Sequence, residues 1–403
     1  MSSQSANLTV PFHRACIGEE EVQAVAEVLR GGWMTMGPKT FEFEQEFAKY
    51  VGSKYAVAVS SGTAALHLAL EAAGVKRGDD VLVPTTTFTA TAEAVTYLGA
   101  RPLLVDIDPS TMNISVPDAA RRITSKTTAI IPVHIAGQPC DMDEIGDFAR
   151  VHQLRVIEDA AHALPSEYRG KRVGRISEFT CFSFYATKTL TTGEGGMITT
   201  DNALAADRMR LMRLHGIERD AWKRYRGDGV WRYEVLEAGF KYNLTDLQAA
   251  IGLVQLVKCD SMKGARQAIA QRYSAGFSFF EELITPAVRS ARSSSWHLYI
   301  LRLRLDRLTV DRHTFIERLW HRGVHCSVHF IPLHLHPYYQ RAFGYRWGQF
   351  PQAEEEYRTC LSLPIYPTMT DDEIRHVIRT VQEVASEFRT PRVIVYAPPM
   401  ASA

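Results

Sequence analysis

The sequence contains few of the features that define several broad classes of protein. Its 403 residues include only six cysteines, with no CxxC pair and no Cys/His cluster of zinc spacing, at Cys16, Cys140, Cys181, Cys259, Cys326 and Cys360. This pattern indicates neither a disulfide framework nor a metal site. We interpret the cysteines as buried free thiols of a protein that acts in the reducing cytoplasm.

Other absences concern membranes and nucleic acids. The first ten residues, MSSQSANLTV, have neither the basic nor the apolar segment of a signal peptide, and no run approaches the roughly 18 apolar residues of a membrane span. Lys and Arg number 46 against 45 Asp and Glu, a net charge of +1. This balance offers no electrostatic argument for a nucleic-acid or membrane partner. The composition is that of an ordinary globular enzyme.

What the sequence does contain, from about residue 57 to residue 200, is an alternation of short apolar runs and helical patterns. Several runs are rich in Val and Ile, which is typical of strands buried on both faces. The predicted strands are Tyr55–Val59, Val81–Val83, Pro102–Asp106, Ala129–His134, Arg155–Glu158, Thr180–Tyr185 and Met197–Thr199. Together with intervening helical stretches such as Ala64–Ala73, Ala90–Leu98 and Met142–His152, they predict a mostly parallel α/β sheet. Ligands bind such sheets beyond the carboxyl ends of the strands.

The flanking regions predict a second, smaller unit. The expected elements are an amphipathic helix, Glu19–Arg30, a loop, Gly31–Pro38, a long helix, Leu244–Phe280, a strand, His297–Leu303, a helix, Val310–Arg322, and further short elements. We therefore divide the chain into a large domain with an N-terminal arm, residues 1–258, and a small C-terminal domain, residues 259–403.

One lysine lies directly after a predicted buried strand. In FSFYATKTLTTGEGG (residues 182–196) an apolar run ends just before Lys188, and a Gly-rich turn follows. An enclosed lysine loses its charge more readily than an exposed one, as the Schiff-base chemistry of pyridoxal 5′-phosphate (PLP) requires. Taken alone, a lysine after a strand is more often an exposed surface residue.

A carboxylate ends another predicted strand. In VIEDAAHA (residues 156–163) the apolar run leads into Asp159, with His162 close behind. A carboxylate at this place could keep the ring nitrogen of PLP protonated, and His162 could meet a polar ring substituent. Equally, Asp159 could cap a helix and His162 could be a packed core residue.

A third strand end has the composition of a phosphate site. SSGTAAL (residues 60–66) places small and hydroxyl residues between a strand and a helix, where free N–H groups and the helix dipole favour an anion. Helix capping alone would also explain the Ser and Thr. The segment lacks the patterns of a Walker loop and of a dinucleotide-binding loop. Together, the three strand ends supply an anion site, an acid and an amine, which PLP requires.

The ordered motifs resemble the sugar aminotransferases of the DegT/DnrJ/EryC1/StrS group, which have the fold-type-I (aspartate aminotransferase-like) architecture. Besides the three segments above, the matching motifs are GWMTMGP (32–38), LLVDID (103–108), IPVHIAGQPCDMD (131–143), LHGI (214–217), GFKYNLTDLQAAIGLVQL (239–256), WHLYILRL (296–303), VHFIPLH (328–334) and LSLPIYPTMTD (361–371). The resemblance implies a large PLP-binding domain with a mixed, mostly parallel sheet and a smaller C-terminal α/β domain.

The resemblance also implies roles for individual residues. Lys188 would form the Schiff base with the cofactor, Asp159 would pair with its pyridine nitrogen, His162 would lie near its phenolic oxygen, and Phe88 would stack on its ring.

Further roles concern the phosphate and the substrate. Gly62, Thr63 and Ser183 would hold the phosphate, and Asn243 would reach the phosphate of the neighbouring subunit, which makes a homodimer the minimal active unit. Thr35 and Gly37, in the loop before Pro38, and His329 would meet the sugar nucleotide.

One position of the family indicates the reaction type. Members that catalyse a deoxygenation carry His where the others carry lysine, so Lys188 favours transamination. L-glutamate would deliver its amino group to PLP, and the resulting pyridoxamine 5′-phosphate would aminate a keto sugar. Lys188 would move the proton in both halves.

The residues within the motifs are most similar to those of enzymes that aminate carbon 4. The expected substrate is a dTDP- or UDP-linked 4-keto-6-deoxyhexose, in amino-sugar biosynthesis of a natural product or surface polysaccharide. Phe88 departs from the Trp of the 4-amino-arabinose enzyme, which argues against a UDP-4-keto-pentose. Residues 218–233, rich in basic and aromatic side chains, either cover the nucleotide or form a solvated loop at a dimer edge. The sequence also allows a C3 sugar or cyclitol aminotransferase, an aminohydroxybenzoate-type dehydrating enzyme, or a non-catalytic PLP-binding sensor.

Overall fold

The centre of the protein is a seven-stranded sheet with the order β1–β9–β8–β5–β4–β2–β3. The computed structural model describes residues 8–218 and 233–391. All neighbouring strands of the sheet are parallel except β9, which runs antiparallel to both β1 and β8. The predicted mixed, mostly parallel sheet is therefore confirmed.

The strands of this sheet lie where the sequence predicted them. They are β1 (Tyr55–Val59), β2 (Asp80–Pro84), β3 (Arg101–Val105), β4 (Thr127–Ile130), β5 (Arg155–Asp159), β8 (Phe179–Ser183) and β9 (Gly196–Thr200). The main difference is β4, which was predicted to continue to His134. Its ladder stops because Pro132 has no N–H to donate. The chain nevertheless stays beside β5, since the Asp159 N–H donates to the Pro132 carbonyl at 2.9 Å.

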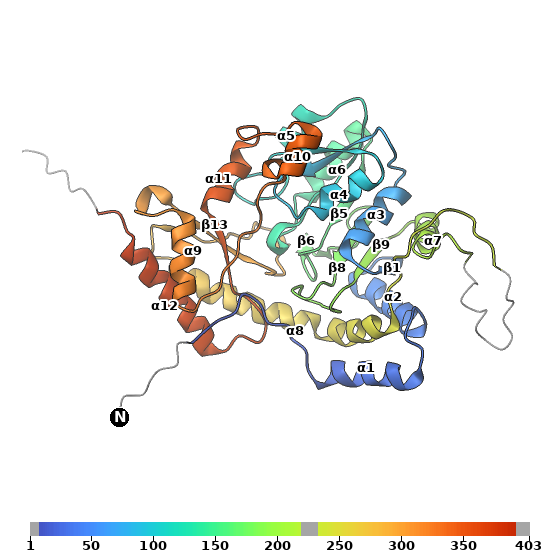
Figure 1. The fold of residues 1–403 in the computed structure, drawn as a ribbon, viewed down its shortest axis with the longest axis horizontal. Helices are drawn as coiled ribbons and strands as arrows, with labels where there is room; N and C mark the ends of the chain where they lie inside the picture. Colours follow the sequence, from blue (N-terminus) through green and yellow to red (C-terminus); the bar gives the residue numbers. More distant parts are fainter. Residues whose placement is uncertain (1–7, 219–232, 392–403) are drawn as a thin grey trace, which may run out of the picture.

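Both faces of the sheet are covered by helices. Successive side chains of a strand point to opposite faces, and in β1 Val57 and Val59 belong to one apolar core while Ala56 and Ala58 belong to another. The first core includes residues of α3 (Gly62–Ala72), α4 (Ala90–Tyr97) and α7 (Ala203–Met212). The opposite face is covered by α2 (Pro38–Val51), α5 (Val116–Arg122), α6 (Met142–His152) and α8 (Asp246–Phe277). The result is a three-layer arrangement (Figure 1).

A smaller antiparallel sheet lies in the C-terminal part. It consists of β10 (Leu283–Ile284), β12 (Tyr299–Leu303) and β13 (Cys360–Leu363), and its core includes residues of α9 (Arg312–His321) and α12 (Asp371–Glu387). Only short elements were predicted after residue 322, and this prediction is wrong for α12. This 17-residue helix begins with a capping box, in which Thr370 and Glu373 satisfy each other's backbone N–H groups.

The remaining elements are short. They are α10 (Pro337–Phe343), α11 (Pro351–Thr359), a three-stranded sheet of β6 (Glu167–Tyr168), β7 (Lys171–Arg172) and β11 (Arg292–Ser293), and the 3-10 helices Ile135–Gly137, Leu305–Arg307 and Leu333–Leu335.

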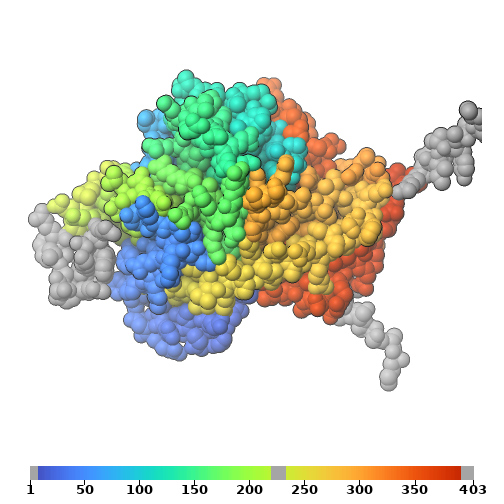
Figure 2. Space-filling model, turned by 180° about the vertical axis from the view of Figure 1, so that it is seen from behind, coloured from blue at the N-terminus to red at the C-terminus, as the bar shows by residue number. Residues whose placement is uncertain are grey.

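The 32-residue helix α8 connects the two parts of the chain. Its length is about 48 Å at the usual rise per residue. The helix α1 (Glu19–Gly31) and α2 pack on it, and α12 packs on it as well. From behind, the yellow atoms of α8 form a band below both the green sheet domain and the orange C-terminal segment (Figure 2). The predicted boundary near residue 258 lies inside this helix, and the division into two domains stays a prediction.

The cysteines and the helix lengths also bear on the predictions. All six cysteines are free, and all except the half-buried Cys16 are buried. The prediction of unpaired thiols is thus confirmed. None of the helices in residues 8–218 and 233–391 is long and apolar enough to cross a membrane.

A buried carboxylate joins the beginnings of α2 and α8. The N-cap of α2, Gly37, has no side chain, and Asp246 of α8 takes its place. The Asp246 carboxylate accepts hydrogen bonds from the backbone N–H groups of Gly37 at 2.8 Å, Lys39 at 3.1 Å and Thr40 at 3.0 Å, and from the Thr40 hydroxyl at 2.7 Å. A side chain 209 residues away therefore provides the cap that the local sequence lacks.

We predict that Asp246→Ala destabilises the protein by about 2–4 kcal/mol, because it leaves several buried donors without an acceptor. Chemical denaturation measures this change. Asp147→Ala is the matched control, since Asp147 forms only an exposed ion pair with Arg150 and its loss should change stability by less than about 0.5 kcal/mol. Equal stability of the two variants would contradict the capping role.

Candidate active site

A cavity of about 430 Å³ opens at the carboxyl ends of the sheet strands. This volume is within the usual range for small-ligand sites. Eight of the residues predicted from the sequence line it, namely Gly62, Thr63, Phe88, Asp159, His162, Ser183, Lys188 and His329. The structure thus brings together the amine, the acid and the anion site that the sequence placed at three separate strand ends.

Lys188 follows β8 in a tight turn. The Lys188 N–H donates to the Tyr185 carbonyl at 2.9 Å, which closes the turn and points the chain back toward β9. Burial lowers the pKa of Lys188 from 10.5 to about 8, although the Asp159 carboxylate acts in the opposite direction. The amine is therefore far easier to deprotonate than that of a surface lysine, which removes the objection that this lysine is a solvated one.

Asp159 is the last residue of β5 and is buried. One carboxylate oxygen accepts from the Thr91 hydroxyl at 2.8 Å, and the other accepts from the Ala161 N–H at 3.1 Å. No helix begins here, so the interpretation as a helix cap is wrong. Burial raises the pKa of Asp159, while the two hydrogen bonds and Lys188 oppose the rise. A cationic group placed against this carboxylate would be stabilised strongly.

His162 forms a buried pair with His297, which also lines the cavity. The two ring centroids are 4.4 Å apart, and neither Nδ1 atom has a hydrogen-bond partner among the described residues. Burial lowers the pKa of both imidazoles well below 6.5. His162 is therefore a neutral ring with an unsatisfied nitrogen, not a satisfied core histidine.

The anion site is built on the first turn of α3. The Ser61 hydroxyl accepts from the Ala64 N–H at 3.1 Å, so capping explains this serine. Gly62 and Thr63 then present the first N–H groups of the helix to the cavity. A Cβ on Gly62 would lie 2.9 Å from the Ser183 Cβ, so the close approach of α3 and β8 requires glycine here.

Three predicted residues do not line this cavity. Thr35 is exposed, and its carbonyl accepts from the Asp246 N–H at 3.1 Å, while Gly37 is buried under Trp33 and Asp246. The Asn243 side chain accepts from Lys241 Nζ at 2.5 Å. Their roles toward the substrate and a neighbouring subunit stay predictions. Most of the loop predicted at residues 218–233 lies outside the described residues.

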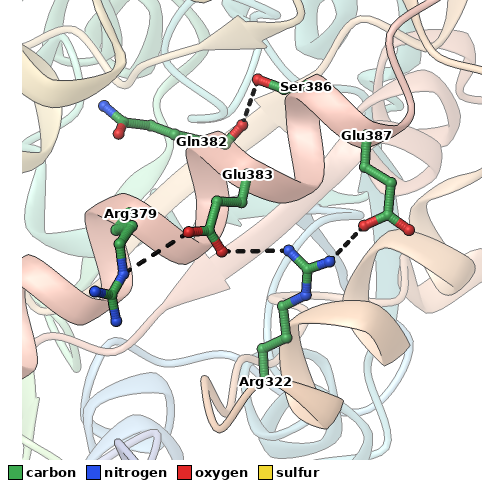
Figure 3. A pocket seen from close by; sticks show the side chains of 6 residues that line it. All are labelled: Arg322, Arg379, Gln382, Glu383, Ser386 and Glu387. Carbon is green, nitrogen blue, oxygen red and sulfur yellow. Dashed lines mark hydrogen bonds and ion pairs between the residues drawn. The ribbon is translucent and has the colours of Figure 1, made fainter.

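A second, open crevice on α12 is no competing site. It is lined by Arg322, Arg379, Gln382, Glu383, Ser386 and Glu387 (Figure 3). Arg322 pairs with both Glu383 and Glu387, and Arg379 lies 3.8 Å from Glu383. The charges of the crevice thus neutralise one another, and none is left to attract a ligand.

Comparison with known proteins decides the family. The family model "DegT/DnrJ/EryC1/StrS aminotransferase family" matches residues 15–382. The chain belongs to this family. An uncharacterized protein of Methanocaldococcus jannaschii is 51% identical over 94% of this chain and 98% of its own length. The spore coat polysaccharide biosynthesis protein SpsC of Bacillus subtilis is 47% identical over the same shares.

Solved structures agree with this membership. The candidate sugar aminotransferase Spr1654 from Streptococcus pneumoniae is 33% identical, and its PLP form covers 95% of this chain and 100% of its own with a TM-score of 0.89. Its PMP form gives a TM-score of 0.88 over 94% of this chain and 98% of its own. The fold-type-I architecture is thus confirmed, and the chain is a sugar aminotransferase that uses PLP.

The cavity of this aminotransferase fits the cofactor. The first turn of α3 suits a phosphate because Gly62 has no side chain to fill the space there. The unsatisfied Nδ1 of His162 suits a polar ring substituent. Asp159 would hold the ring nitrogen, and Lys188 would meet the aldehyde. Phe88 is 60% exposed at the wall of the cavity, which leaves its ring free to stack on the cofactor.

Several residues of this site were not predicted from the sequence. Thr91, which donates to Asp159, lies four residues after Thr87, and the two hydroxyls are 2.8 Å apart. His297 and Phe330 line the cavity within motifs that were recognised, but neither was assigned a role. Only the fold reveals them, because their partners are distant in the sequence.

We predict that in the cofactor-free protein Lys188 titrates near pH 8, whereas surface lysines titrate near 10.4. Asp159→Asn should lower this pKa further, because it removes the carboxylate that stabilises the ammonium form. Competitive acylation followed by mass spectrometry measures both values. The surface lysines serve as internal controls, and an unchanged or raised pKa in Asp159→Asn would contradict the assignment.

We predict that Gly62→Ala weakens cofactor binding at least about tenfold, because its Cβ would crowd Ser183 and narrow the anion site. Equilibrium dialysis with PLP measures the affinity. Gly146→Ala, in the exposed part of α6 where a Cβ meets nothing within 4 Å, should bind as the unchanged protein does. If both variants bind PLP equally well, the phosphate does not lie at α3.

Proposed function

We propose that this enzyme moves the amino group of L-glutamate to carbon 4 of a nucleotide-linked 4-keto-6-deoxyhexose. The observation that carries the reaction type is a half-buried lysine of lowered pKa that lines one cavity together with Asp159. The position on the sugar is supported by the likeness of VIEDAAHA and KYNLTD to enzymes that aminate carbon 4. The relatives SpsC, a spore coat polysaccharide biosynthesis protein, and Spr1654, a candidate sugar aminotransferase, support a sugar substrate and a role in polysaccharide synthesis.

Lys188 would be the proton carrier. PLP, when bound, supplies an aldehyde that accepts an amino group and a ring that withdraws electrons. Lys188 Nζ, with a pKa of about 8, would take a proton from the donor carbon in the first half-reaction and give a proton to the sugar carbon in the second. Asp159 would keep the ring nitrogen protonated, since Thr91 and the Ala161 N–H hold the carboxylate in place. A histidine in place of Lys188 would lack this amine.

His329 would face the sugar. Its Nδ1 lies 2.9 Å from the Ser362 hydroxyl, which fixes the ring. Burial, followed by the nearby Lys188 charge, lowers the pKa of His329 to about 4. The imidazole is therefore neutral at physiological pH and suited to hydrogen bonds with sugar hydroxyls or a keto oxygen, which carry no charge.

The amino donor rests on the family resemblance. Among the described residues that line the cavity no arginine is present, and Glu194 adds a carboxylate. The charges of the cavity therefore do not by themselves select a dicarboxylate. We propose L-glutamate, a homodimer in which Asn243 serves the neighbouring subunit, and a cytoplasmic enzyme, with which the free thiols agree.

We predict that the purified enzyme converts dTDP-4-keto-6-deoxyglucose and L-glutamate to a sugar nucleotide with an amine on carbon 4, which NMR of the product identifies. Lys188→Ala should lower turnover by about 10²–10⁴-fold or more, since it removes the proton carrier, while binding of PLP without a covalent bond persists. Lys171→Ala, on the surface strand β7, is the control and should keep full activity.

Each outcome of this experiment separates one candidate function from the rest. An amine at carbon 3, or turnover of a cyclitol or a UDP-4-keto-pentose instead, would overturn the substrate but keep the reaction. A visible spectrum that neither L-glutamate nor another amino donor changes would favour a PLP-binding sensor. Full turnover by Lys188→Ala would refute the role of the lysine itself.

A further inference from the structure

The turn that presents Lys188 contacts a segment from the far end of the chain. His13 Nε2 lies 3.0 Å from the Ala186 carbonyl oxygen, 173 residues away in the sequence. A carbonyl can only accept, so His13 Nε2–H is the donor. Burial, together with the Arg266 charge, lowers the pKa of His13 to about 4, and the ring is therefore neutral at physiological pH.

The contacted carbonyl occupies a special place in the turn. Because the Lys188 N–H donates to the Tyr185 carbonyl, residues 185–188 form a β-turn whose central peptide joins Ala186 and Thr187. The orientation of this central peptide distinguishes type I from type II turns. A hydrogen bond to the Ala186 carbonyl therefore holds the central peptide of the turn that ends at Lys188.

The segment that carries His13 is itself anchored at both sides. Val10 exchanges backbone hydrogen bonds with Gly323 at 2.7 Å and His325 at 3.1 Å. Arg14 forms an ion pair with Glu373 at 3.1 Å. His13 is thus held between two attachments to the C-terminal part, while its ring reaches the turn after β8 in the large sheet.

The neighbouring residue contacts another residue of the cavity wall. The ring of Phe12 stacks on His329, with centroids 5.5 Å apart and an interplanar angle of 21°. The same two residues of the N-terminal segment therefore touch both the turn of Lys188 and the histidine predicted to face the sugar.

We propose that His13 is a positioning residue of the active site, which holds Lys188 in its reactive orientation through the Ala186 carbonyl. The inference rests on the assignment of Lys188 made above, but on neither the sugar nor the amino donor. It does not require His13 to touch cofactor or substrate. Residues 10–14 thereby link the C-terminal part of the chain to the turn that carries Lys188.

The test compares variants that keep or lose the donor. In His13→Gln the side-chain amide can still donate to Ala186, whereas His13→Leu fills the space without a donor. The first measurement is the rate at which the cofactor-free protein takes up PLP covalently, followed by absorbance. We expect His13→Leu to be at least tenfold slower and His13→Gln to stay within about threefold of the unchanged protein.

A second readout needs no cofactor. Competitive acylation should show the pKa of Lys188 moving up from about 8 toward that of an exposed lysine in His13→Leu, because the side chain is no longer held in the cavity. His313→Leu is the matched control, since it makes the same substitution at an exposed histidine of α9 that pairs with Glu317 on the surface. This variant should match the unchanged protein in both measurements.

Each remaining outcome decides the matter. Uptake by His13→Leu at the normal rate, equal slowing of the Gln and Leu variants, or the same loss in His313→Leu would overturn the proposal. If His13→Leu does not fold, His13→Asn, whose shorter amide cannot reach Ala186, replaces it. Covalent uptake by Lys188→Ala at the normal rate would instead refute the assignment of Lys188, so the two failures are distinguishable.

Discussion

A fully buried carboxylate, Glu158, holds together the three segments on which the active site depends. It accepts hydrogen bonds from His134 Nε2 at 2.8 Å, after β4, from the Thr180 hydroxyl at 3.0 Å, in β8, and from the Ser177 N–H at 3.0 Å. Glu158 pairs with Thr180 in the parallel ladder of β5 and β8. A slip of this register would leave the carboxylate with unpaired lone pairs in the core, which is costly. The register in turn places the end of β5, with Asp159, beside the end of β8, before Lys188.

The chemistry of the cavity follows from this placement, because burial lowers the pKa of Lys188 and raises the pKa of Asp159. Desolvation favours the neutral form of both Lys188 and Asp159, while their mutual attraction favours the charged forms. A cofactor with a protonated ring nitrogen and an anionic phosphate would relieve this conflict, since it would bring a cation to Asp159 and an anion to the first turn of α3. The cavity is therefore prepared for a ligand of mixed charge.

The strands and site residues that follow from a local sequence pattern were predicted, whereas a helix and the hydrogen bonds that depend on residues distant in the chain were not. The strands β1 and β5 follow from Val- and Ile-rich runs, and Lys188, Asp159 and Gly62 follow from their positions at strand ends. The helix α2 was not predicted, although Phe43, Phe47 and Val51 recur on one helical face, because its N-cap residue is glycine and its capping group belongs to α8. The hydrogen bonds of Thr91 to Asp159 and of His13 to Ala186 join residues 68 and 173 positions apart, and no local sequence pattern predicts them.

The cap between α2 and α8 has a consequence for attempts to change the sugar that the enzyme accepts. The loop before α2 invites mutagenesis, since Thr35 and Gly37 are predicted substrate residues. A side chain at Gly37 would place its Cβ 2.2 Å from Trp33 Nε1 and 2.8 Å from an Asp246 carboxylate oxygen. Variant libraries that randomise both positions would therefore return mostly misfolded protein, and the loss of signal would be mistaken for a loss of recognition. Thr35, the other predicted substrate residue, has an exposed side chain and can be varied without disturbing this cap.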